Sequence, residues 1–235
     1  MLSKKTLEAI TSQTLDYWYN EAKKPEIVAI AQGKEIGHKL ADLVDEKTTA
    51  LLMVNYLTKQ ERDARGRKRS RSMGDLWLQD AGIYHPLNVK TGIVGAEGRP
   101  NLVSLKRVLA AVMAREIDSY YLLMVKMCVD TIPISPSVYL LDMLDWLDYV
   151  AFDSGPGQMM LKGETFFTAY DANRPGHLDI KQKVQKLMDL YEDGERRLKE
   201  NRERALEYYR QEFRDFMSGQ ELTVTPETQR RLRLA

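Results

Sequence analysis

Apolar and polar residues follow three different spacings along the chain, and each spacing predicts a type of element. In residues 4–22 and 33–46 the apolar positions recur every three or four residues, which indicates helices with one buried face. Residues 74–79 and 84–91 have the character of strands on either side of a short turn. Residues 121–129 are apolar on both faces, which predicts a strand in the interior of a sheet.

The segments between and after these strands complete the expected order of elements. Residues 100–117 form a helical pattern with Pro100 near its start, a favoured position for proline. Residues 148–162 suggest two short strands around a Gly-Pro-Gly turn, and residues 178–217 are helical in pattern. A hairpin, a crossover helix and a buried strand predict an α/β or α+β fold around a mixed sheet, with helical N- and C-terminal segments.

Composition narrows the class of protein. The chain has 235 residues, of which 43% are hydrophobic and 29% charged, as in ordinary soluble globular proteins. No apolar run approaches the ~20 residues that a membrane span needs, and the N-terminus lacks the apolar core of a signal peptide. The single Cys128 rules out an internal disulfide and fits a reducing compartment. We therefore expect a cytoplasmic protein with no membrane partner.

Two common kinds of site lack their signatures. The three histidines show no zinc spacing, and no GxxxxGK[ST] motif indicates a nucleotide cofactor. Asp142, Asp145 and Asp148 recur at helical spacing, which favours a charged stripe opposite an apolar face over a metal site.

Charge is distributed unevenly although the formal net charge is only +1. Residues 59–72 are strongly basic, and such a segment is either a solvated loop or an arm that contacts phosphates. Its position directly before Asp75 favours the contact with DNA. The expected phosphate contacts are Arg67, Lys68, Arg69 and Arg71.

Asp75, Asn88 and Lys90 form the candidate site. With a two-residue turn at Ala81-Gly82, the register of the hairpin places Asp75 opposite Asn88. Strand alternation then puts Asn88 and Lys90 on one face and directs Val89 into the core. An acid, an amide and an amine converge in this arrangement. The same residues also fit an edge hairpin whose polar ends face solvent.

Such a cluster suits phosphodiester hydrolysis. A divalent ion, usually Mg2+, is held by a few oxygen ligands, polarises the phosphate and lowers the pKa of a bound water. A neighbouring lysine positions that water and stabilises the developing negative charge. We therefore expect Mg2+ as the cofactor.

The segment "GDLWLQDAGIYHPLNVKTG", followed by "RPNLVSLKRVLA", resembles the core of the PD-(D/E)XK type II restriction endonucleases, most closely their HincII and EcoRV branch. The resemblance covers roughly residues 35–162. It implies a restriction-endonuclease-like mixed β-sheet flanked by helices, within a single endonuclease domain over residues 1–235. The expected parts of that domain are a helical N-terminal part for dimerisation (1–50), a catalytic and recognition core (74–165) and a C-terminal helical part (178–217).

The same resemblance implies the roles of the site residues. Asp75 corresponds to the shared metal ligand, Asn88 to the second acidic position and Lys90 to the catalytic lysine, while the carbonyl of Val89 is another metal contact. The family often places a glutamate from an N-terminal helix at the edge of the site. Glu35 is the candidate for that glutamate, although it also fits a solvated helix position.

Asn88 departs from the family pattern. An amide oxygen still coordinates Mg2+ but brings no negative charge, so the affinity for the metal falls. Either the protein naturally uses asparagine and obtains charge from Glu35 or Asp80, or Asn88 replaces an aspartate in an inactivated form that binds DNA without cutting it.

Two loops are the candidates for reading DNA sequence. In the first, Arg99 and Asn101 suit base edges while Ser104 and Lys106 suit phosphates. In the second, Ser154, Gln158 and Lys162 lie on a Gly-rich turn that is otherwise an ordinary hairpin connection.

The expected partners are double-stranded DNA and a second copy of the chain. Cleavage of both strands of a palindrome is matched by a C2 homodimer, for which Trp18 and Tyr19 of the N-terminal helices are candidate contacts. The alternatives are a sequence-specific DNA-binding protein without cleavage and a structure-specific repair nuclease.

Overall fold

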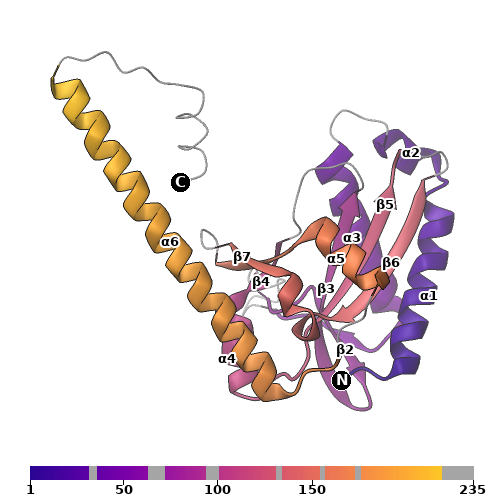
Figure 1. Ribbon diagram of the computed structural model, residues 1–235. Coiled ribbons are helices and arrows are strands. Elements are labelled where there is room, and N and C mark those ends of the chain that lie inside the picture. The colour runs from indigo at the N-terminus through magenta and orange to yellow at the C-terminus, as the bar shows by residue number, and fades with distance from the viewer. Residues whose placement is uncertain are drawn as a thin grey trace.

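The computed structural model describes residues 1–31, 36–62, 72–93, 101–130, 134–153, 157–172 and 176–218. Three helices come first: α1 (Lys4–Glu21), α2 (Pro25–Ala31) and α3 (Ile36–Asn55) (Figure 1). Helix α1 begins after Ser3, whose hydroxyl accepts a hydrogen bond from the Thr6 N–H and so caps the helix. The predicted helical N-terminal segment is confirmed.

The main sheet has five strands in the order β1-β2-β3-β5-β6. Strands β3 and β5 are parallel and every other neighbouring pair is antiparallel. Helix α4 (Leu105–Met113) lies in the connection from β3 to β5, as a parallel pair requires. The predicted mixed sheet is therefore confirmed. The strands are β1 (Thr58–Lys59), β2 (Leu76–Asp80), β3 (Ile83–Ile93), β5 (Tyr121–Cys128) and β6 (Ser135–Asp142).

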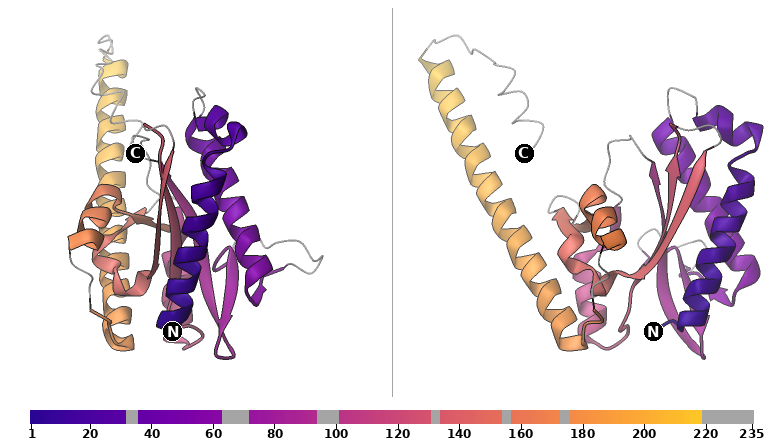
Figure 2. Two further views of the ribbon diagram at one scale, coloured as in Figure 1. Left: turned by 90° about the vertical axis from the view of Figure 1, so that its right-hand side faces the viewer. Right: turned by 45° about the vertical axis from the view of Figure 1, so that its right-hand side comes forward.

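Helices cover both faces of this sheet (Figure 2). Leu123 and Val125 of β5 pack on the side of α1 and α3, where Trp18 is fully buried. Leu122 and Met124 point to the other side and join a second core that includes α4 and α6. A strand buried from both sides is apolar on both faces, which explains the pattern of residues 121–125 and Met127, while the half-buried Lys126 lies over the ring of Phe167.

A second, three-stranded antiparallel sheet has the order β4-β8-β7. It consists of β4 (Asn101–Ser104), β7 (Val150–Asp153) and β8 (Gln158–Leu161), and α5 (Gly163–Ala172) follows it. The prediction of a helix from residue 100 onward was wrong at its start, because residues 101–104 pair with β8 and the helix begins only at Leu105. The two predicted strands of residues 148–162 are confirmed.

The three aspartates expected on a charged stripe do not lie on one helix. Strand β6 ends at Asp142, and two short 3-10 helices follow, Met143–Asp145 and Leu147–Tyr149. Asp142 and Asp145 point inward, so the prediction of a solvated stripe was wrong for them.

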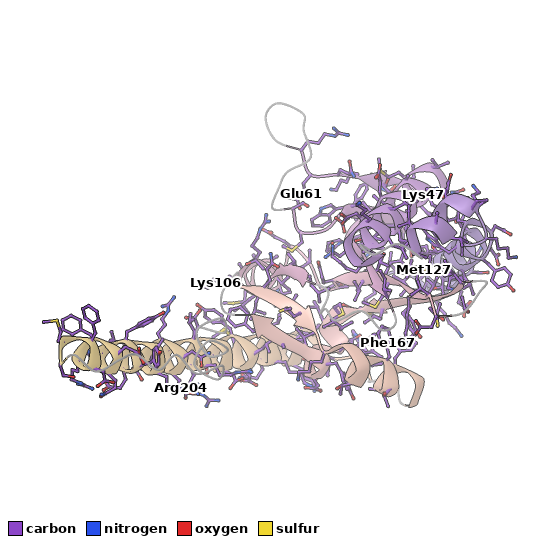
Figure 3. The ribbon with its side chains drawn as sticks, turned by 90° about the horizontal axis from the view of Figure 1, so that it is seen from above. Lys47, Glu61, Lys106, Met127, Phe167 and Arg204 are labelled. Carbon is purple, nitrogen blue, oxygen red and sulfur yellow. The ribbon has the colours of Figure 1, made fainter. Side chains whose placement is uncertain are left out.

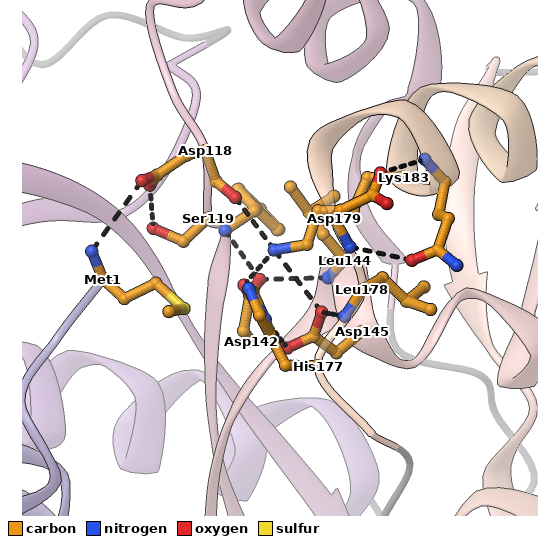
Figure 4. Close-up of polar contacts among 12 residues, drawn as sticks. Met1, Asp118, Ser119, Asp142, Leu144, Asp145, His177, Leu178, Asp179 and Lys183 are labelled. Carbon is orange, nitrogen blue, oxygen red and sulfur yellow. Dashed lines mark hydrogen bonds and ion pairs between the residues drawn. The ribbon is translucent and has the colours of Figure 1, made fainter.

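The inward aspartates surround Lys183, a buried residue near the start of α6 (Ile180–Met217) (Figure 4). The Nζ atom of Lys183 lies 2.8 Å from Oδ2 of Asp142 and 3.4 Å from Oδ1 of Asp145, and it donates to the carbonyl of Asp118. Asp142 also accepts hydrogen bonds from the N–H groups of Tyr120 and Leu144. This network joins the start of α6 to the end of β6.

Helix α6 then crosses the second sheet and projects beyond the rest of the protein (Figures 1 and 3). A Cβ atom at Gly194 would lie 1.7 Å from the ring of Phe152, so only glycine allows the helix to pass this close to β7. The predicted C-terminal helix is confirmed. None of the described helices is both long and apolar enough to cross a membrane.

Candidate active site

The β2–β3 hairpin has the predicted two-residue turn and register, but its ladder ends before the expected pair of Asp75 and Asn88. Ala81 and Gly82 form its turn with positive φ values of 47° and 82°, as a two-residue hairpin turn requires. The paired positions run from Asp80 with Ile83 to Leu76 with Leu87. Asp75 is therefore the first residue beyond the end of this ladder.

Gly74 lets the chain pass close to β3 just before Asp75. A Cβ atom at Gly74 would lie 2.6 Å from the carbonyl oxygen of Leu87, a distance that real side chains do not adopt. The Asp75 carboxylate accepts a hydrogen bond of 2.9 Å from the Val89 N–H. Because a strand residue directs its N–H and C=O to the same side, the Val89 carbonyl also points to the side of Asp75.

Gln60 and Glu61, the two residues that follow β1, hold the turn that carries Asp75. The sequence analysis did not identify either of them. Glu61 Oε1 accepts hydrogen bonds from the N–H of Met73 at 2.9 Å and from Nε1 of Trp77 at 3.1 Å. Gln60 Nε2 donates to the carbonyl of Asp75 at 3.4 Å. These bonds orient Asp75 from outside the hairpin.

Lys90 lies between two carboxylates. Its Nζ atom is 3.9 Å from Oδ2 of Asp75 and 4.0 Å from Oδ2 of Asp45, which belongs to α3. The three side chains are between 24% and 28% exposed, so the cluster is accessible to small ligands. Asp45 is a second functional candidate that sequence reasoning missed, since no spacing distinguishes it from Asp42 and Glu46 on the same helix.

Asp45 has a perturbed ionisation. Burial raises its pKa to about 6, and the nearby charge of Asp75 adds to the effect. Thr91 donates a hydrogen bond of 2.6 Å to Oδ1 of Asp45 and opposes the shift, as does the charge of Lys90. Perturbed carboxyl groups next to a lysine are typical of catalytic sites, although structural ion pairs also produce them.

Asn88 lies on the opposite face of β3 from Leu87 and Val89, and it is only 6% exposed. Its amide faces the hydroxyl of the fully buried Tyr120, which forms no hydrogen bond with another described residue. Burial and the charge of Asp75 raise the pKa of Tyr120 well above its ordinary value, and Asn88 opposes them.

The donor set fits Mg2+ in ligand type. Asp45, Asp75, the Asn88 amide and the Val89 carbonyl are all hard oxygen donors. In the part of the chain that the structure describes, no group of three or more His, Cys, Asp or Glu side chains could hold a metal ion. A metal at this site would therefore rely on two carboxylates and on neutral oxygens.

Several predicted residues lie outside the described part of the chain. Glu35, the expected acid at the edge of the site, is one of them. The others are Arg67, Lys68, Arg69, Arg71, Arg99 and Ser154.

The two predicted recognition loops meet in the second sheet. Ser104 at the end of β4 pairs with Gln158 at the start of β8, and Asn101 pairs with Met160. The Oε1 atom of Gln158 is buried and forms no hydrogen bond with another described residue. The structure thus brings Ser104 and Gln158 together.

The lysines of these loops have partners within the protein. Lys106 lies 3.9 Å from Glu195 and over the ring of Tyr191 where α6 meets the body (Figure 3). Lys162 donates to the carbonyl of Asp148 at 2.8 Å. A contact with phosphate would have to compete with these interactions.

No model of a known protein family matches the chain, and no curated protein matches it.

Proposed function

We propose that this protein is a Mg2+-dependent endodeoxyribonuclease of the type II restriction class, which makes double-strand cuts at a short palindromic DNA site. The observation that carries the proposal is the position of Lys90 between Asp45 and Asp75, beside the end of the β2–β3 ladder. Metal-dependent phosphodiester hydrolysis uses carboxylates that hold the ion, and a cation close to the same phosphate stabilises the negative charge that develops on it.

The roles follow from the contacts of each residue. Asp75 and Asp45 would hold Mg2+ together with the Asn88 oxygen and the Val89 carbonyl, and the ion would supply a Lewis acid for the phosphate and acidify a bound water. Lys90 orients the attacking water and stabilises the negative charge that develops on the phosphate.

Asp45 makes Asn88 compatible with activity. The family pattern puts a second acid at position 88, and Asn88 supplies only a neutral oxygen there. The carboxylate of Asp45 approaches the same lysine from α3 and provides the missing charge. We therefore propose that asparagine is the natural residue at this position and that the chain is active.

The proposed substrate is double-stranded DNA, bound by a homodimer. The basic segment with Arg67, Lys68, Arg69 and Arg71 directly precedes the turn that carries Asp75, so phosphates bound by it would be near the site. Ser104 and Gln158 are the proposed contacts from the second sheet.

The test is incubation of bacteriophage DNA with the purified protein and Mg2+, beside the Lys90→Ala variant. We expect discrete fragments from the unaltered protein and none from the variant. Absence of any cleavage over a wide range of protein concentrations, with and without Mg2+, would refute the nuclease proposal.

The second candidate is a sequence-specific DNA-binding protein that does not cut. The observation that favours it is the neutral Asn88, buried where the family has an acid. Binding to DNA of one particular sequence in an electrophoretic mobility-shift assay, with no nicking of that DNA in Mg2+, would support this candidate. Preferential cutting of branched or mismatched DNA would instead indicate a structure-specific repair nuclease.

A further inference from the structure

Lys126 is a half-buried lysine of β5 on the same face of the main sheet as Lys90. The parallel register pairs Gly92 of β3 with Lys126, and Gly92 follows Lys90 by two positions. Because side chains alternate along a strand, the side chains at these three positions share one face. Lys90 and Lys126 are therefore diagonal neighbours on adjacent strands, with Cα atoms ~8 Å apart.

The ring of Phe167 joins the two strands on this face. Phe167 belongs to α5 and packs against the core on that side of the sheet. A Cβ atom at Gly92 would lie 3.8 Å from Cζ of Phe167, and Nζ of Lys126 is 4.2 Å from the centroid of the same ring. Gly92 places no side chain between Lys90 and Lys126. The ring therefore holds the second ammonium group on the side of the sheet that carries the first.

Lys126 forms no ion pair with a carboxylate of any described residue. Its neighbours across the strands are Gly92 on β3 and Ser137 on β6, and Met124 lies two positions before it on β5. None of these neighbours carries a charge. The lysines of the two predicted recognition loops, by contrast, contact a carboxylate and a carbonyl oxygen of the protein.

These surroundings suit the binding of an anion. Partial burial of an ammonium group without an anion is unfavourable, and lysines are seldom buried unless they are paired. The contact with the ring of Phe167 orients the ammonium group of Lys126 but does not neutralise it. The charge is therefore held in place beside Lys90 with capacity for an anionic ligand.

We propose that Lys126 binds a phosphate of the DNA backbone next to the phosphate at which Lys90 acts. This inference rests on the proposed function in that DNA has to lie over Lys90. Each DNA strand carries one phosphate every ~3.4 Å along the helix axis, so a flexible lysine ~8 Å from Lys90 reaches an adjacent phosphate. Such a contact adds affinity and fixes the position of the DNA strand, but it reads no base.

The test is the binding of a labelled DNA duplex without divalent ions, measured by fluorescence anisotropy over a range of NaCl concentrations. Lys126→Gln should weaken binding several-fold at low salt. It should also reduce the slope of log K against log salt concentration by ~1, because one phosphate fewer is neutralised. The loss should be the same for duplexes of different sequence. Lys126→Arg keeps the charge and should retain the slope of the unaltered protein.

Lys23→Gln is the matched control. Lys23 also lies over an aromatic ring, with Nζ 4.1 Å from the centroid of Tyr19, but it follows α1, which packs on the opposite face of the main sheet. Its replacement removes the same charge and should leave the slope unchanged. Thermal unfolding shows whether each variant is folded. Lys126→Met, which keeps an unbranched side chain over Phe167, replaces Lys126→Gln if the latter is unfolded.

The outcomes separate this inference from the nuclease proposal. Equal affinity and slope for Lys126→Gln and the unaltered protein, or an equal loss in Lys23→Gln, would overturn the phosphate contact and leave the nuclease proposal in place. Binding that depends on Lys126, without any cleavage in Mg2+, would support the contact and refute the nuclease. No binding of DNA by the unaltered protein would overturn both.

Discussion

Nζ of Lys90, on a strand of the main sheet, lies 4.0 Å from Oδ2 of Asp45, on helix α3. Asp75, the residue just before β2, approaches the same atom to 3.9 Å. One positive charge therefore lies between two negative charges, with the Asn88 amide on the same strand as the lysine. The functional proposal rests on this arrangement.

Lys90→Ala should abolish DNA cleavage, with a loss of at least ~100-fold, because the charge that stabilises the transition state is removed. Cleavage of a labelled DNA fragment in Mg2+ measures the loss. Lys5→Ala, which changes an exposed lysine on α1, is the control and should keep full activity. Equal activity of Lys90→Ala and the unaltered protein would remove Lys90 from the mechanism.

Asp45→Asn should stabilise the metal-free protein at pH 7 while it reduces cleavage. The folded-state pKa of Asp45 is about 6, above its ordinary value, so its ionisation opposes folding. The contribution of protonated Asp45 to the free energy of unfolding is fully present below about pH 4 and is lost as the pH rises through about 6. The loss is at most ~3 kcal/mol.

Chemical denaturation between pH 4 and pH 8 without divalent ions measures this effect. The stability of the unaltered protein should fall more steeply from pH 4 to pH 7 than that of Asp45→Asn. Identical pH profiles would show that Asp45 is not held in a perturbed state.

Gly74→Ala should destabilise the protein by several kcal/mol, because a methyl group would overlap the Leu87 carbonyl. The backbone has to move, and Asp75 moves with it. Gly176→Ala is the matched control, since a Cβ atom there meets nothing within 4 Å. Thermal unfolding compares the two, and equal melting temperatures would contradict the close approach at Gly74.

Lys183→Ala should cost ~3–5 kcal/mol, because it leaves Asp142 buried without its cation. Burial already raises the pKa of Asp142, and loss of the lysine raises it further. The cost should therefore grow as the pH rises and the acid ionises. Urea unfolding measures it, with the more exposed Lys186→Ala expected to cost less than ~1 kcal/mol. Equal losses for the two variants would contradict the role of the buried network.

Local patterns in the sequence predicted the parts of the fold whose structure depends on neighbouring residues. The two-residue turn expected at Ala81-Gly82 predicted the hairpin register, and the apolar character of both faces of residues 121–129 predicted an interior strand. Residues 178–217 also have a local helical pattern, and the structure confirms α6 there.

Contacts between distant segments were not predictable in this way. Strand β4 lies in a helix-like run, and only its pairing with β8 makes it a strand. Asp45 joins Lys90 because α3 packs on the main sheet, which no pattern within α3 specifies. Lys183 is buried despite its charge, because two aspartates from the end of β6 and the following turn surround it.

The most direct test of the account compares the unaltered protein with Asn88→Asp and Asp45→Asn on bacteriophage DNA in Mg2+, at equal protein concentrations. We predict the same discrete fragments from the first two, with less Mg2+ needed by Asn88→Asp, and little or no cleavage by Asp45→Asn. Cleavage by Asn88→Asp alone would mean that Asp45 does not supply the missing charge and that the unaltered chain only binds DNA. Cleavage by none of them would contradict the proposed nuclease site altogether.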